Sequence, residues 1–237
     1  MILLIKSKII GFEEPLCAEI KLNKKENNVN NILETLYNEI KFIKEENKIL
    51  KEKIDFLDVF KQNSSEIFEN LNEIKLIENR LKKYSKYENK TMFLKLLFKF
   101  TEKEDKISDF HKKCDNNPNI LCVIKTSKNV KFGGFTEISW TTSNQEKRDD
   151  KAFCFSLTKY KIYDIIKGMI AIGDYDNLIV FRDNIFWISP DYKTLYKGSC
   201  AKNSQSNYSG EDIMYEINNG EKDFIIDKFE VYQVLFK

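Results

Sequence analysis

His111 and Cys114 are the residues of this 237-residue chain whose types and spacing come closest to catalytic chemistry. Three positions apart, they would share one face of a helix, and an imidazolium beside a cysteine stabilises the nucleophilic thiolate. The sequence offers no third group to orient the histidine. We therefore favour a packing role, in which Phe110 and Cys114 face the core and His111 hydrogen-bonds a neighbouring strand. His111 is the only histidine in the chain. A metal site with several histidine ligands cannot form, and a Ser-His-Asp triad could use only this one residue. We assign no catalytic residue, metal or cofactor.

The five cysteines contain no Cys-x-x-Cys pair and are Cys17, Cys114, Cys122, Cys154 and Cys200. Such a set is typical of free thiols in a reducing compartment, so we expect a cytoplasmic protein. A cysteine-dependent redox enzyme or sensor is the alternative function. Its candidates are Cys114 and Cys200, the latter beside Lys197 and Lys202 in a predicted loop. Cys122 and Cys154 fall in predicted strands, where burial suppresses reactivity.

Gly133 and Gly134 do not form a phosphate-binding loop, because neither GxxxxGK[ST] nor GxGxxG occurs around them. Glycines inside a strand allow a bulge or the close approach of another group. Trp140 is a candidate for that neighbour.

Glu230 lies in an alternating strand and is expected to face away from Phe229 and Val231. One interpretation is an edge-strand charge that blocks unwanted sheet pairing, and the other is a carboxylate that faces a partner. Asp115 and Asp149 lack the spacing of a calcium loop, so we expect them to be solvated.

Residues 30 to 60 follow a seven-residue repeat, which predicts a coiled coil. The a and d positions are Leu33, Leu36, Ile40, Ile43, Asn47, Leu50, Ile54 and Leu57. A single Asn at an a position, here Asn47, favours a parallel, in-register dimer. The facing g and e positions would then pair Glu39 with Lys44, Glu46 with Lys51, and Lys53 with Asp58. Asn30 or Asn31 is expected to cap the helix.

The alternative is a helical hairpin within one chain. Asn63 and Glu66 resemble a capping box for a second helix that would end near Tyr84 and fold back on the first. Its apolar stripe would be Ile67, Leu71, Ile74, Ile77 and Leu81. We favour pairing between chains, because the opposite charges at the g and e positions would face each other in a parallel pair of helices but not in an antiparallel hairpin.

The pattern of apolar residues in the sequence changes near residue 90. Residues 85–92 read as a linker, and short apolar and aromatic runs separated by turn residues then continue to the end. They predict an antiparallel β-sandwich with a helix near Phe110. The expected organisation is an N-terminal segment (1–29), a long α-helical coiled-coil region (30–84) and a mainly-β domain (93–237).

Charge and hydropathy argue against a nucleic-acid-binding protein and against a membrane protein. Thirty-nine basic residues balance 37 acidic ones, and only three are arginines, which argues against nucleic-acid binding. The apolar N-terminus, residues 1–5, is too short to insert into a membrane.

Five motifs, in order, resemble the TLDc domain family over residues 94–236. They are Leu96-Leu97-Phe98, Phe110-His111-x-x-Cys114-Asp115, Phe132-Gly133-Gly134-Phe135 with Trp140, Asp150-x-Ala152-Phe153-x-Phe155-Ser156-Leu157, and Phe229-Glu230-Val231-Tyr232-x-Val234. The chain differs around residues 173–180, where the family has a glycine-rich stretch.

The resemblance implies a β-sandwich with short helices and no established catalytic chemistry. Family members are associated with resistance to oxidative stress, and several bind the vacuolar proton-pumping ATPase. We therefore expect a non-enzymatic adaptor, which dimerises through the coiled coil and presents two TLDc-like domains to a protein partner.

Overall fold

The computed structural model describes residues 29–51, 54, 65–100, 106–181, 185–188, 197–200, 209 and 213–237, the last range without the side chains of 213–215. The chain divides into two compact units between residues 55 and 56. In the first unit, residues 29–51 and Ile54 are helical. Asn30 and Asn31 therefore lie inside the helix, and the prediction that one of them caps it is wrong. No helix among the described residues is both long and apolar enough to cross a bilayer.

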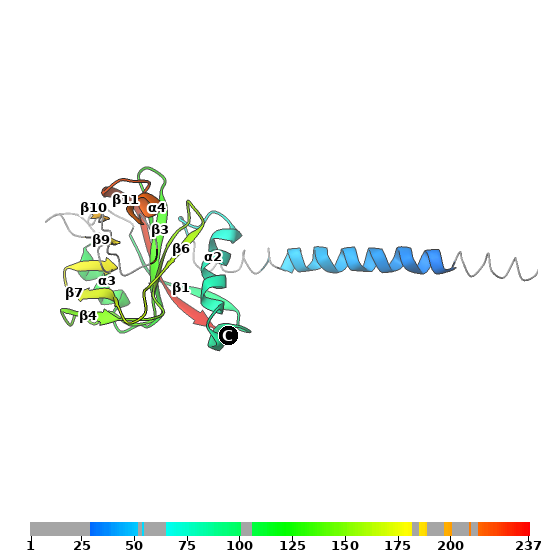
Figure 1. Ribbon diagram of the computed structural model, residues 1–237, viewed down its shortest axis with the longest axis horizontal. Helices are drawn as coiled ribbons and strands as arrows, with labels where there is room; N and C mark the ends of the chain where they lie inside the picture. The colour runs from blue at the N-terminus through cyan, green and yellow to red at the C-terminus, as the bar shows by residue number, and fades with distance from the viewer. Residues whose placement is uncertain are drawn as a thin grey trace, which may run out of the picture. The chain divides into compact units, whose positions relative to one another are not determined.

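The second unit is built from antiparallel strands with a few helices (Figure 1). The strands are β1 (Met92–Lys99), β2 (Ile120–Thr126), β3 (Lys131–Thr136), β4 (Gln145–Arg148), β5 (Phe153–Ser156), β6 (Lys161–Asp164), β7 (Ile170–Tyr175), β8 (Leu178–Phe181), β9 (Phe186–Ile188), β10 (Lys197–Ser199) and β11 (Asp223–Phe236). The helices are α2 (Leu71–Lys82), the 3-10 helix η1 (Ser85–Tyr87), α3 (Ile107–Cys114) and α4 (Ile213–Asn218). The expected mainly-β, antiparallel domain is confirmed.

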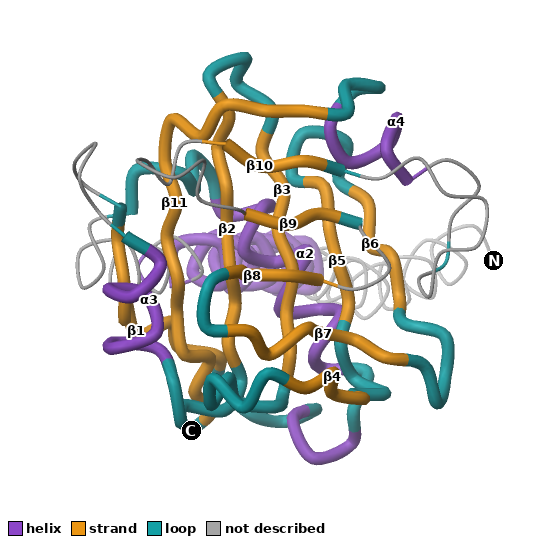
Figure 2. Tube along the Cα trace, turned by 90° about the vertical axis from the view of Figure 1, so that its left-hand side faces the viewer, coloured by secondary structure: helices purple, strands orange, loops and turns teal. Residues whose placement is uncertain are grey.

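The strands pair in the order β4-β7-β8-β9-β10-β11-β2-β3-β5-β6, with β1 on the free side of β11. The long strand β11 pairs with β10 at its start and with β1 and β2 further on, and its register with β2 shifts between Ile226 and Lys228. Such irregularities let one strand pass from one layer of a sandwich to the other. Figure 2 shows β8 and β9 running across β2, β3 and β5.

Two hydrophobic clusters fill the two faces of the layer formed by β1, β2, β3, β5, β6 and β11. The cluster between the layers includes Phe132, Trp140, Phe181 and Phe186. The second cluster lies under α2 and joins Ile74, Ile77 and Leu81 of the helix to side chains of β2, β3, β5 and β11. In Figure 1, α2 lies on one side of this layer, and β7 and β9 lie on the other.

The packing of α2 changes two expectations. The helix begins at Leu71, after Asn70, whose side chain accepts a hydrogen bond from the Glu73 amide, and not after Asn63, which lies outside the described residues. Its apolar stripe covers the sheet, so it is not available for a hairpin with the first helix. The β-rich unit therefore includes α2, which the sequence interpretation grouped with the coiled coil.

The expected linker is also part of this packing. Tyr87 in η1 is buried, and its ring stacks on Phe236 at a centroid distance of 4.0 Å. Residues 85–92 therefore tie α2 to the last strand.

Candidate interaction surfaces

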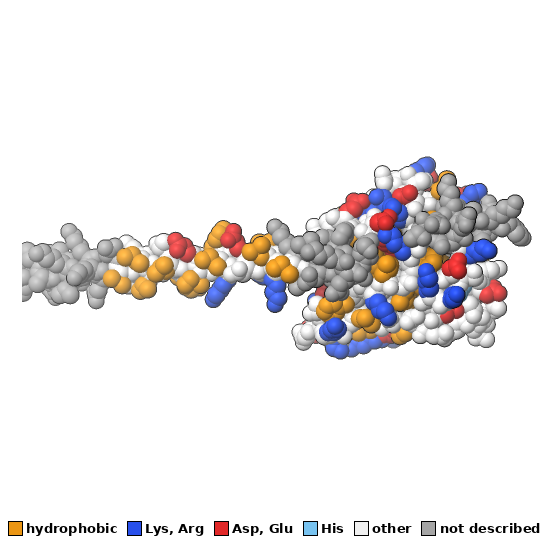
Figure 3. All heavy atoms as spheres, turned by 180° about the vertical axis from the view of Figure 1, so that it is seen from behind, with side chains coloured by type: hydrophobic (Ala, Val, Ile, Leu, Met, Phe, Trp, Pro, Cys, Tyr) orange, Lys and Arg blue, Asp and Glu red, His pale blue; other side chains and the backbone are white. Residues whose placement is uncertain are grey.

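The helix of residues 29–51 presents the predicted apolar seam to solvent. Six seam residues are 48 to 57% exposed in the single chain, namely Leu33, Leu36, Ile40, Ile43, Leu50 and Ile54. Asn47 lies among them and is exposed. Leu57 lies outside the described residues. Figure 3 shows a band of hydrophobic side chains along this helix. Exposing so much apolar surface is costly in water, so a partner that covers it would stabilise the helix.

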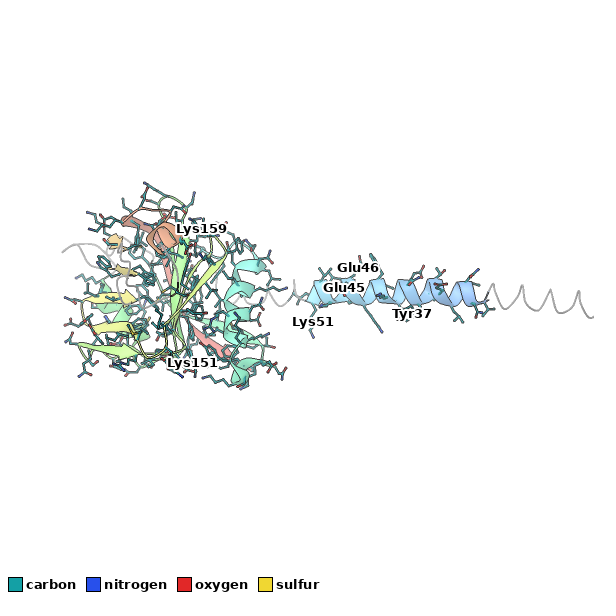
Figure 4. The ribbon with its side chains drawn as sticks, viewed as in Figure 1. Tyr37, Glu45, Glu46, Lys51, Lys151 and Lys159 are labelled. Atoms are coloured by element: carbon teal, nitrogen blue, oxygen red, sulfur yellow. The ribbon has the colours of Figure 1, made fainter. Side chains whose placement is uncertain are left out.

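Charged side chains flank the seam on both sides. Figure 4 shows Glu46 and Lys51 projecting from opposite sides of the helix. In the described part of this helix, an ion pair joins Lys48 to Glu45 across 3.9 Å, and both side chains are well exposed. Such a pair contributes little to stability. The proposed partners Lys53 and Asp58 lie outside the described side chains.

In α3, Phe110 and Cys114 are buried, as the packing interpretation expects. The Nδ1 atom of His111 lies 2.8 Å from a carboxylate oxygen of Asp115, and not on a neighbouring strand. Asp115 is therefore a hydrogen-bond partner and not a freely solvated carboxylate. Burial, reinforced by the Asp115 charge, raises the pKa of the Cys114 thiol to about 12. This shift disfavours the thiolate that nucleophilic catalysis requires.

The glycine pair of β3 makes room for two aromatic rings. A Cβ at Gly134 would lie 2.5 Å from Cε1 of Phe181. A Cβ at Gly133 would collide with the backbone carbonyl of Cys122 and would also lie 2.6 Å from Cζ of Phe155. The pairing of β2 with β3 is continuous, without a bulge. The prediction of close approach is confirmed, but the neighbours are the backbone of Cys122 and the rings of Phe155 and Phe181. Trp140 packs against Phe181 at 5.9 Å between centroids.

Glu230 is fully buried on β11, between β1 and β2, so both the edge-strand and the partner-facing interpretations are wrong. One carboxylate oxygen accepts hydrogen bonds from the hydroxyls of Ser65 (2.7 Å) and Tyr232 (2.6 Å). The other accepts the amide of Glu66 at 2.8 Å and lies 3.8 Å from Nζ of Lys99. Glu230 therefore anchors the segment that leads into α2.

Salt bridges attach the same segment to the sheet at its surface. Glu66 binds Lys99 and Lys228, whereas Glu69 binds Lys125 and Lys131. Hydrogen bonds from Lys228 and Lys99 lower the pKa of Glu66 to about 2. The carboxylate of Glu66 is therefore charged throughout the physiological pH range.

A second buried carboxylate, Asp174 on β7, was not recognised from the sequence. It accepts the amides of Thr141, Thr142 and Ser143 at 2.8 to 3.0 Å and binds Nζ of Lys147 at 2.8 Å. These bonds hold its pKa well below the usual range despite burial. The loop that they fix includes Thr142 at φ 52°, which a β-branched residue rarely adopts. A charged residue inside a strand was the available signal.

Asp149 differs in the same way from the solvated loop carboxylate that we expected. It is buried, and it accepts hydrogen bonds from the hydroxyl of Thr136 at 2.8 Å and from the amides of Glu137 and Lys151 at 2.6 and 3.0 Å. It orders the connection between β3 and β5.

The described cysteines, Cys114, Cys122, Cys154 and Cys200, are all buried. Cys200 does not lie in an exposed loop, and burial together with the Asp223 charge raises the pKa of its thiol. Burial also raises the pKa of the Cys122 thiol. The described part of the chain contains no group of three or more His, Cys, Asp or Glu side chains placed to hold a metal ion.

Comparison with known proteins agrees with this architecture. The family model of the TLDc domain matches residues 61–235, which include α2, strands β1 to β10 and β11 up to Leu235. A comparison with curated proteins found no match. Because the family model covers most of the chain, this protein belongs to the TLDc domain family.

Proposed function

We propose that the protein is a non-enzymatic adaptor in which residues 33–57 pair two copies in a parallel coiled coil, so that two TLDc domains are presented together. The exposed seam of the N-terminal helix carries this proposal. Its heptad spacing suits knobs-into-holes packing, Asn47 favours the in-register dimer, and the g-to-e charges are opposite in sign. Two domains on one dimer raise the avidity for a partner without any new contact.

The TLDc family is associated with resistance to oxidative stress. We propose that this protein acts in that response in the cytoplasm through a protein partner. The vacuolar proton-pumping ATPase, to which several family members bind, is the first candidate. The Glu230 and Asp174 networks fix the segment that leads into α2 and the loop of residues 141–143 to the sheet, and a preformed surface favours binding of a partner.

The alternative, a cysteine-dependent redox enzyme or sensor, draws no support from the described thiols, because reactive cysteines are exposed and have lowered pKa values. Replacing Cys114 and Cys200 by serine in separate variants tests it. An adaptor variant that still folds keeps its partner binding and shows no change in peroxide consumption. A loss of peroxide consumption in either variant would favour the enzyme.

Light scattering on the full chain tests the pairing. We expect twice the chain mass of 28.1 kDa, and we expect the single mass for Leu36→Lys with Ile43→Lys, which places charge in the seam. The control, Lys41→Gln, changes an outward b position and should remain dimeric. Immobilised vacuolar ATPase should then retain the dimer at least tenfold longer than the monomeric variant, because two domains bind at once. A monomeric parent protein contradicts the proposal.

A further inference from the structure

The N-terminal helix carries a second apolar stripe that the proposed seam does not use. With Leu33 at an a position, Phe42 and Ile49 both fall at c, which faces away from the partner helix in a two-stranded coil. Phe42 is 64% exposed and Ile49 is 46% exposed. Single exposed apolar residues are ordinary. These two, however, recur after seven residues on a face that the coil leaves to solvent.

Charge is segregated around this stripe. The helix neighbours three and four positions from both Phe42 and Ile49 are Glu45 and Glu46. Glu39 adds a third carboxylate beside Phe42. The other flank of the helix carries four lysines, Lys41, Lys44, Lys48 and Lys51, together with Glu34. Figure 3 shows the acidic and basic side chains gathering on opposite sides of the helix.

Pairing through the seam does not remove this asymmetry. Glu39 and Glu46, at g positions, would meet lysines of the second copy. Glu45 lies at f beside the stripe, and its exposed ion pair with Lys48 is weak. The described surface at Phe42 is hollowed, and the hollow is lined by Phe42 itself, by Thr35, Asn38 and Glu39, and at its edge by the seam residue Ile43. A side chain of a docked helix would fit against Phe42 there.

The charges indicate what covers the stripe. A further copy of this chain, laid stripe against stripe, would bring glutamates against glutamates, which is repulsive. A helix with apolar side chains along one face and Lys or Arg beside them matches both the apolar stripe and its acidic border. We propose that the Phe42–Ile49 stripe is a docking surface for a basic amphipathic helix of a protein partner. The direction in which the stripe faces rests on the proposed coiled coil.

Fluorescence anisotropy with the full chain tests the docking. The probe is a labelled 21-residue synthetic helix with Leu at seven-residue spacing flanked by Lys and Arg, and the matched probe carries Glu at those flanking positions. We expect the basic probe to bind at least tenfold tighter than the acidic one, with the difference shrinking as salt rises. Phe42→Gln with Ile49→Gln should weaken the basic probe at least tenfold, and Glu45→Lys should weaken it as well.

Tyr37 provides the matched control. It is an equally exposed aromatic residue, at 68%, on the lysine side of the helix (Figure 4), so Tyr37→Gln should leave binding unchanged. Equal affinity for both probes, or an unchanged affinity in the stripe variant, would overturn the docking proposal. Light scattering on the same samples separates it from the pairing proposal. A stripe variant that keeps the dimeric mass leaves the coil intact, whereas one that loses it shows that a second copy covers the stripe.

Discussion

Replacing Glu230 with alanine is the sharpest perturbation of the β-rich unit. The substitution removes the acceptor for Ser65, Glu66 and Tyr232 at once, and it leaves Lys99 without the carboxylate at 3.8 Å. The methylene groups contribute little by comparison, because the site is polar. The change therefore reports on one buried carboxylate and on the segment that it anchors.

The expected loss follows from the groups left unpaired. A buried donor without an acceptor costs about 1–3 kcal/mol, and three donors lose theirs here, whereas Lys99 keeps its salt bridge with Glu66. These costs overlap, so we expect the free energy of unfolding to fall by about 3–5 kcal/mol. For a unit of this size, each kcal/mol lowers the melting temperature by roughly 2–4 °C, which gives a shift of about 6–20 °C.

Urea unfolding of the full chain measures this loss, and amide hydrogen exchange locates it. The Glu66 amide should exchange faster, since it donates to Glu230. The control is Glu78→Ala on α2, which removes an ion pair with Lys82 and should cost less than about 0.5 kcal/mol. A loss below 1 kcal/mol in Glu230→Ala, with unchanged exchange at Glu66, would refute the anchoring role.

Three further outcomes are expected. Gly134→Ala should lower the free energy of unfolding by about 1–3 kcal/mol, because its Cβ would overlap the Phe181 ring. Adding Phe181→Leu to this variant should restore part of the loss. An unchanged free energy of unfolding in Gly134→Ala would contradict the tight contact. The lowered pKa of Glu66 contributes stability above pH 4.5 that is lost as the pH falls towards 2, so acid unfolding should be shallower in Glu66→Gln than in the parent. In a Cys17→Ser background, a thiol reagent at pH 8 should label Cys114 only after unfolding, and rapid labelling of the folded protein would contradict its burial.

The elements were predictable where local pattern and tertiary packing agree. The heptads of residues 33–54 follow a helix period, and Ile120–Thr126 is a β-branched and apolar run that became a strand. The glycine pair in β3 predicted that another group would pack closely against this strand, although the sequence did not identify which ring it would be. That choice depends on β8 packing face to face with β3.

The buried carboxylates were not predictable in the same way. Glu230 alternates with apolar neighbours as an edge residue would, and only the pairing of β11 with both β1 and β2 buries it. Likewise, the stripe of α2 suits a helix or a sheet equally well, so its spacing alone could not choose the partner. In both cases the environment of the residues is set by contacts between segments far apart in the sequence. A short stretch of sequence does not reveal such contacts.

Disulfide trapping at two seam positions shows directly whether two copies pair in parallel and in register. In the Cys17→Ser chain, Leu36→Cys and Leu50→Cys are oxidised in separate samples. A parallel, in-register pair brings each cysteine next to its own copy, within the roughly 4.4–6.8 Å between Cα atoms that a disulfide spans. We therefore expect covalent dimers of twice 28.1 kDa in both samples. An antiparallel pair centred on Ile43 would separate identical positions by about 20 Å at 1.5 Å per residue, so uncrosslinked chains in both samples would contradict it.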